Sequence, residues 1–184
     1  IDYSISRWKE TLCSTCELFT SKDISFVPVG RIVRSGGMKA VRAFYASLGE
    51  EYVKALDDMI VFDAVIFNTD RHYGNFGFLV DSHTNKIIAP APLFDHGNAL
   101  LNLAGAEALK SKENILKYAK TQMPCVYDDF VGEARKVMTH EYRNHLRKLL
   151  HFRFKRHSRY NLSPERLAFV EFAVQSRVKE LLEE

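Results

Sequence analysis

Two short polar segments on either side of a hairpin-like stretch constrain this chain more than any other feature. The first is NTDRHYGN at Asn68–Asn75, and the second is LFDHG at Leu93–Gly97. Between them, residues 76–91 contain two apolar, strand-like runs separated by a run of turn-forming residues. Antiparallel pairing joins the two ends of a hairpin, so we expect Asn75 at its entry and Asp95 just past its exit to converge on one site.

These segments carry the side chains that phosphoryl transfer from Mg-ATP requires. Asp70 is the candidate catalytic residue that orients the acceptor hydroxyl and takes up its proton. Asn75 offers an amide oxygen and Asp95 a carboxylate, and Mg²⁺ prefers oxygen ligands. His72 is a second candidate, either as a hydrogen-bond donor to phosphate or as a residue that stabilises the loop. A plain polar surface loop is the alternative, but two motifs in this order around a hairpin favour a nucleotide site.

Arg71 has two possible roles. Its guanidinium either binds cofactor phosphate or pairs with an acidic neighbour such as Asp63, which lies in an otherwise apolar predicted helix. Asp63 could be the buried partner of Arg71 or of His72, and either pair would hold the catalytic loop in place.

The remaining pattern predicts an α+β, mostly helical fold. The chain has 184 residues, 46% hydrophobic and 27% charged, which suits one domain or one lobe of a larger one. Residues 1–33 read as short strands and turns, with an apolar run over Phe26–Val33 and a break at 35–37. Helices are expected over about 38–48, 50–67, 106–120, 127–152 and 164–183, with Ser163 and Pro164 beginning the last.

Composition excludes several classes. No apolar stretch is long enough for a membrane span, and three cysteines are typical of a reducing cytoplasm, where we expect the protein to act. A net charge of +3 and a pI near 8.7 do not by themselves indicate nucleic-acid binding.

Cys13-x-x-Cys16 lacks a second cysteine pair for zinc, so buried structural thiols are the favoured interpretation. The basic, histidine-rich stretch 143–159 predicts a solvated helix face, with a docking surface for nucleic acid or an acidic protein as the minority interpretation.

Asn68-x-Asp70-Arg71-His72-x-x-Asn75, followed by Phe94-Asp95-x-Gly97, resembles the C-terminal lobe of HipA-like serine/threonine kinases, which are related to toxin–antitoxin systems. It is also similar, more distantly, to phosphatidylinositol kinases. The resemblance implies a protein-kinase-like C-terminal lobe with a small antiparallel hairpin at the active site. It gives Asp70 the role of catalytic base and gives Mg²⁺ binding to Asn75 and Asp95.

The resemblance also implies how the chain is divided. Residues 1–34 correspond to part of an N-lobe and hinge, with Glu17 and Phe19 near the adenine of ATP, and residues 35–184 to the helical C-lobe. No glycine-rich loop follows a strand before Gly36, so we expect a fragment of a longer chain that lacks most of the ATP-clamping lobe. Such a fragment can be inactive alone. The implied partners are a protein substrate with a Ser or Thr acceptor and an antitoxin-type protein, with no membrane. The alternatives are a catalytically silent kinase-like binding module, or a lipid or small-molecule kinase.

Overall fold

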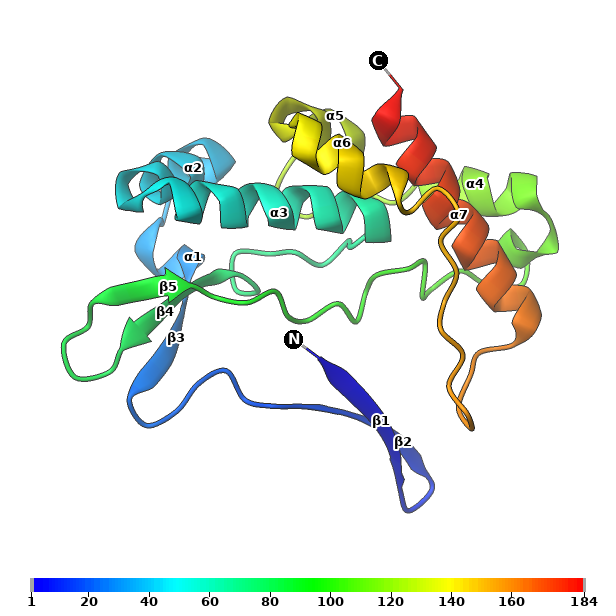
Figure 1. The fold of residues 1–184 in the computed structure, drawn as a ribbon, viewed down its shortest axis with the longest axis horizontal. Coiled ribbons are helices and arrows are strands. Elements are labelled where there is room, and N and C mark those ends of the chain that lie inside the picture. The colour runs from blue at the N-terminus through cyan, green and yellow to red at the C-terminus, as the bar shows by residue number, and fades with distance from the viewer. Residues whose placement is uncertain (1, 184) are drawn as a thin grey trace. The chain divides into compact units, whose positions relative to one another are not determined.

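The computed structural model describes residues 2–183 (Figure 1). The chain divides into two compact units. The first unit comprises the chain up to Tyr52 together with His72–Asp95. The second comprises Val53–Arg71 together with the chain from His96 onward. Each polar segment is therefore split between the two units, after Arg71 in the first segment and after Asp95 in the second. Each unit is described by itself below.

The first unit contains two antiparallel sheets and two helices. Strands β1 (Tyr3–Trp8) and β2 (Thr11–Cys16) form a hairpin, while β3 (Ile24–Pro28), β4 (Gly77–Asp81) and β5 (Ile87–Pro90) form a three-stranded sheet in the order β3-β4-β5. Helix α1 (Val29–Ile32) follows β3 directly, and α2 (Gly37–Leu48) begins at the predicted Ser-Gly-Gly break.

The predicted hairpin over residues 76–91 is confirmed as β4 and β5, with Phe78 opposite Pro90. Its turn is held by Asp81, whose Oδ1 accepts from the Thr84 backbone N–H at 2.7 Å and from the His83 backbone N–H at 3.0 Å. The sequence did not indicate that β3 pairs with β4 as a third strand. Gly77 permits this pairing, because a Cβ there would collide with the Val27 carbonyl oxygen of β3.

The core of the first unit is built around Phe78, which is fully buried on β4. Tyr45 and Phe44 of α2 pack against it with ring centroids at 4.7 and 5.5 Å, and Tyr52 lies at 6.1 Å. Aromatic contacts of this kind fix the sheet against α2.

The second unit is helical. Helix α3 (Glu50–Ile66) starts in the first unit and contributes most of its length to the second. It is followed by a short 3₁₀ helix η1 (Ala108–Lys110), then α4 (Lys112–Lys120), α5 (Phe130–Val137), α6 (His140–Arg147) and α7 (Pro164–Leu182). Helices α4, α5 and α6 each contact α7. The core is formed by apolar residues of α3 and α7, including Leu56, Met59, Val170, Val178 and Leu181.

The predicted helix over 127–152 is wrong as a single element. Thr139 interrupts it by accepting from the Tyr142 backbone N–H at 3.4 Å, so that α6 starts anew after α5. The predicted helix over 106–120 likewise starts only at Lys112, where Ser111 accepts from Asn114 N at 3.1 Å. Short polar side chains favour such caps because they bond the unsatisfied amides of the first helical turn.

Two smaller expectations are also corrected. Cys13 is half-buried and Cys16 exposed on β2, so they are not buried thiols. Helix α6 ends at Arg147, so most of the basic stretch 143–159 consists of turns and irregular chain and is not a helix face. Within residues 2–183 the model contains no helix that combines the length and apolar character needed to cross a membrane.

Candidate functional site

A fully buried ion pair anchors the first polar segment in the second unit. The Arg71 and Asp63 side chains have 0% exposure. Arg71 Nε donates to Asp63 Oδ2 at 2.9 Å, and Arg71 Nη2 donates to Asp63 Oδ1 at 3.1 Å. This two-point geometry is the strongest that a guanidinium and a carboxylate adopt. Of the two partners considered for Asp63 of α3, Arg71 and His72, the structure shows Arg71.

Two asparagines hold Asp70, and one of them, Asn68, connects it to this pair. Asn68 is fully buried; its Nδ2 donates to Asp63 Oδ1 at 2.9 Å, and its Oδ1 accepts from the Asp70 backbone N–H at 3.2 Å. Asn98 Nδ2 donates to Asp70 Oδ2 at 3.2 Å. The Asn98 carbonyl accepts from both the backbone N–H and the hydroxyl of Thr69, each at 3.2 Å. The backbone and the carboxylate of Asp70 are thus both positioned.

His96 closes the network from the second polar segment. Its Nδ1 lies 3.0 Å from Arg71 Nη2. Since a guanidinium can only donate, His96 Nδ1 accepts, which assigns the neutral tautomer with the proton on Nε2. The imidazole also meets the ring of Phe62 edge-on, with centroids 5.2 Å apart. The histidine in the Asp-His-Gly segment is therefore bonded to the buried arginine.

In the first unit, His72 shapes the turn that leads to Asn75. Its Nδ1 accepts from the Gly74 backbone N–H at 3.0 Å, and its carbonyl accepts from the Asn75 backbone N–H at 2.9 Å. His72 itself is exposed, whereas Asn75 is 6% exposed. This geometry matches the loop-stabilising role considered for His72.

The hairpin of the first unit joins the backbone that follows Asn75 to the backbone that precedes Asp95. The Ala91 backbone N–H donates to the Gly77 carbonyl at 2.9 Å. Asn75 comes two residues before Gly77, and Asp95 comes four residues after Ala91. The predicted pairing of the two ends of the hairpin is therefore present.

Asp95 is exposed and adopts a φ of +55°, a left-handed conformation that Asp tolerates better than most residues. The preceding residue, Phe94, packs against Phe19 and Phe26 with ring centroids at 5.3 and 5.1 Å. Phe19, predicted to lie near adenine, thus packs beside the residue that precedes Asp95. Glu17, its predicted companion, is exposed on the segment after β2.

The predicted site residues are distributed over the two units. Asp70 and Arg71 belong to the second unit, whereas His72, Asn75 and Asp95 belong to the first. Sequence reasoning assigned no role to Asn68, Asn98 or His96. Only their position inside or next to the two polar segments could have indicated one, since the pairings join residues up to 29 positions apart.

The oxygen donors of Asn75 and Asp95 fit Mg²⁺, which takes one or two protein ligands and completes its shell with phosphates and water. In residues 2–183 no three His, Cys, Asp or Glu side chains gather where a metal could bind. A magnesium site of one amide and one carboxylate does not require such a cluster. The donor chemistry therefore fits the cofactor that the sequence predicts.

Comparison with known proteins gives a likeness to solved structures. No family model matches the chain, and neither does any curated protein. Among solved structures, the chain is similar to the crystal structure of a Helicobacter pylori proinflammatory kinase, CtkA, with a TM-score of 0.68 and 16% sequence identity. The similarity covers 98% of this chain and 77% of that one. At this identity the comparison shows that the chain has a kinase-like fold.

Proposed function

We propose that this chain is the catalytic part of an ATP-dependent phosphotransferase, most consistent with a HipA-like protein serine/threonine kinase. The observation that carries the proposal is the position of Asp70. Its carboxylate is held by Asn98, and its backbone is held by Asn68, whose side chain bonds Asp63 of the buried Asp63–Arg71 pair. A kinase-like fold makes such a constrained Asp the natural candidate for the catalytic base.

In this proposal Asp70 accepts a hydrogen bond from the acceptor hydroxyl, aligns it for attack and takes up its proton. Proton transfer to a positioned side chain contributes about 10²–10⁴-fold to rate. Asn98 fixes one carboxylate oxygen, so that Asp70 reaches the hydroxyl without first losing rotational freedom. Arg71 acts through Asp63 and His96; because its guanidinium is fully buried, we propose a positioning role for it instead of contact with phosphate.

Asn75 and Asp95 would hold Mg²⁺ through their oxygen atoms. When bound, Mg-ATP supplies the transferred phosphoryl group and the charge that offsets its negative oxygens. His72 shapes the turn that presents Asn75. Phe94, which directly precedes Asp95, packs in an aromatic cluster with Phe19 and Phe26 and so supports the backbone of Asp95. The resemblance to HipA-like kinases adds a Ser or Thr acceptor and an antitoxin-type protein partner to the proposal.

Magnesium-dependent nucleotide binding tests this function against the silent binding module. Isothermal titration calorimetry of the chain with ATP, with and without Mg²⁺, should show affinity that depends on the metal. Asp95→Ala should remove the magnesium-dependent part and weaken binding at least tenfold. Asp23→Ala, an exposed acid of the same unit that pairs with His83, is the matched control and should bind like the unaltered chain. Equal affinity with and without Mg²⁺ would contradict the proposal.

A further inference from the structure

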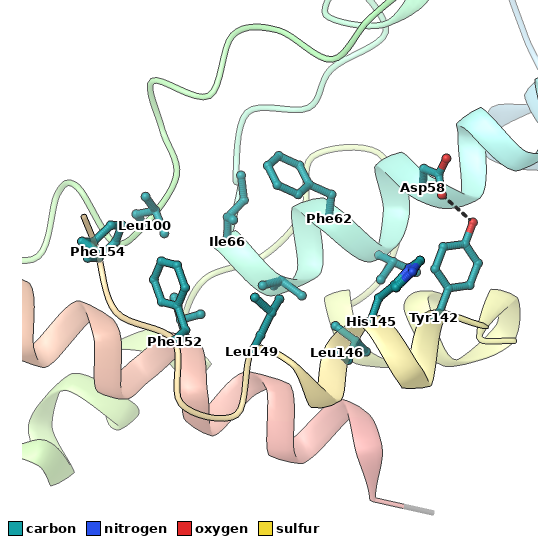
Figure 2. Close-up of a pocket in the computed structure, with 13 residues that line it drawn as sticks. Asp58, Phe62, Ile66, Leu100, Tyr142, His145, Leu146, Leu149, Phe152 and Phe154 are labelled. Atoms are coloured by element: carbon teal, nitrogen blue, oxygen red, sulfur yellow. Dashed lines mark hydrogen bonds between the residues drawn. The ribbon is translucent and has the colours of Figure 1, made fainter. Parts of the chain in front are cut away.

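The second unit contains an apolar cavity of about 390 Å³ that the phosphotransfer proposal does not use. It lies between α3, α6, α7 and the chain that follows α6 (Figure 2). Most of its wall is aliphatic or aromatic, as in Val61, Phe62, Ile66, Leu149, Phe152 and Val174. Its volume is in the range of pockets that hold small molecules, and such pockets combine an apolar wall with a few polar groups.

The polar groups of the cavity gather at one end. Figure 2 shows Asp58, Tyr142 and His145 together there, whereas Phe152 and Phe154 lie at the other end. The cavity is therefore elongated and polarised. The α3 wall from Asp58 to Ile66 is about 12 Å long, at 1.5 Å per helical residue.

The polar end of the cavity offers a ligand more hydrogen-bond acceptors than hydrogen-bond donors. Tyr142 Oη donates to Asp58 Oδ1 at 2.8 Å, and Lys54 Nζ donates to the two Asp58 oxygens at 3.0 and 3.1 Å. A carboxylate accepts at about four lone-pair positions, so Asp58 retains capacity for another donor. Its side chain is 43% exposed, which leaves it accessible.

Three carboxylates act on Tyr142 at this end. Burial raises the pKa of Tyr142, and the carboxylates of Asp58, Asp57 and Glu141 raise it further. Lys54 is the cation that pairs with Asp58 there.

The neighbouring arginines of α6 are engaged elsewhere. Arg143 donates to the Leu182 carbonyl and Arg147 to Asn144 Oδ1. Cavity-lining residues Tyr142, His145 and Leu146 lie on a different face of that helix. The polar end therefore favours a cationic group over an anionic one.

We propose that this cavity binds an elongated apolar amine, with its hydrocarbon part along α3 and its ammonium group at Asp58. With C–C bonds of about 1.5 Å, an extended ten-carbon chain spans roughly 12 Å and matches the wall from Asp58 to Ile66. An ammonium group has three N–H donors and no acceptor, which complements a carboxylate-rich end. A carboxylate in the same place would face Asp58 with like charge. This inference does not depend on the proposed phosphotransfer.

Decylamine, decanol and decanoate test the proposal because they share one chain and differ only in the head group. Calorimetric titration of the chain should give saturable binding in the order decylamine, decanol, decanoate. We expect the amine to bind roughly tenfold more tightly than the alcohol, since a charge-assisted hydrogen bond separates them. Amide hydrogen exchange gives the location, because the Leu100 N–H, bonded to the Ile66 carbonyl at 2.6 Å beside the cavity, should exchange more slowly when decylamine is bound.

Two variants separate the head-group contact from the apolar contact. Asp58→Asn keeps the shape of the side chain and should bring the affinity for decylamine down to that for decanol. Leu149→Trp fills the cavity and should abolish binding of all three probes, with far-UV circular dichroism as the check on folding. Glu113→Gln changes an exposed acid of α4 outside the cavity and should bind like the unaltered chain. Non-saturable binding, equal affinity for the three head groups, or a preference for decanoate would overturn the proposal.

Discussion

Replacing Asp63 with Asn should destabilise the second unit more than any exposed charge replacement. The Asp63 side chain is fully buried and accepts from Arg71 Nε, Arg71 Nη2 and Asn68 Nδ2. Asp63→Asn preserves the size of the side chain but removes the carboxylate charge that the fully buried guanidinium faces. Removing one partner of a buried ion pair costs about 3–5 kcal/mol, so we expect a loss of that size in the free energy of unfolding.

Urea unfolding followed by far-UV circular dichroism measures this loss, because the second unit contains most of the helix. With a slope of about 1–3 kcal/mol/M, the midpoint should fall by one molar or more. Glu113→Gln is the control: its pair with Lys117 is 70–74% exposed on α4, and such pairs contribute about 0.5 kcal/mol. A loss below about 1 kcal/mol for Asp63→Asn would refute the argument that this pair anchors the loop.

A double replacement separates folding from positioning. Asp63→Leu combined with Arg71→Met removes both buried charges, and such exchanges are often neutral or stabilising. Stability should therefore recover relative to Asp63→Asn. Phosphotransfer should not recover, because Asn68 loses the carboxylate that orients it toward Asp70. Full recovery of both would show that the pair has no positioning role.

Three further changes have defined outcomes. Asn98→Ala removes the donor to Asp70 Oδ2 and should lower kcat about tenfold or more with a small change in melting temperature, measured by steady-state kinetics and calorimetry. Ser163→Ala removes the side chain that caps α7 and should cost about 1 kcal/mol in urea unfolding. Hydrogen bonds from Thr84 and His83 hold the pKa of Asp81 below its ordinary value, so the contribution of this turn is present near neutral pH. It should be lost as pH falls from about 4 through the lowered pKa, as an NMR titration of the carboxyl carbon would show.

Local patterns in the sequence predicted the elements that depend on local chemistry. Alternation and turn residues gave β4, β5 and the turn at Asp81, and the Ser163-Pro164 pair gave the start of α7. A single Asp in the apolar α3 indicated a buried partner, and the Asp63–Arg71 pair is the result. In each case the two interacting residues lie within about ten positions of each other in sequence, or the interaction is required because a charged side chain is buried.

Non-local pairing accounts for what was missed. The third strand β3 depends on close approach to Gly77, which lies about fifty residues away in sequence. The bonds of Asn98 to Asp70 and of His96 to Arg71 join segments on the two sides of the hairpin. Thr139 was read as a helix interior residue, although its hydroxyl competes for a backbone amide and starts a new helix. The sequence pattern of a single segment does not indicate which distant residue its side chains will contact.

The most direct test of the central claim is the intact mass of the unaltered parent chain after incubation with Mg-ATP, beside its Asp70→Ala form. Asp128→Ala, which alters an exposed acid of the second unit outside the network, is the matched control. The account predicts phosphate increments on the parent and on the Asp128→Ala control, and none on Asp70→Ala. Equal phosphorylation of the Asp70→Ala form would contradict the role assigned to Asp70. If neither form gained phosphate while an added Ser/Thr protein also stayed unmodified, the silent binding module would be favoured over the kinase.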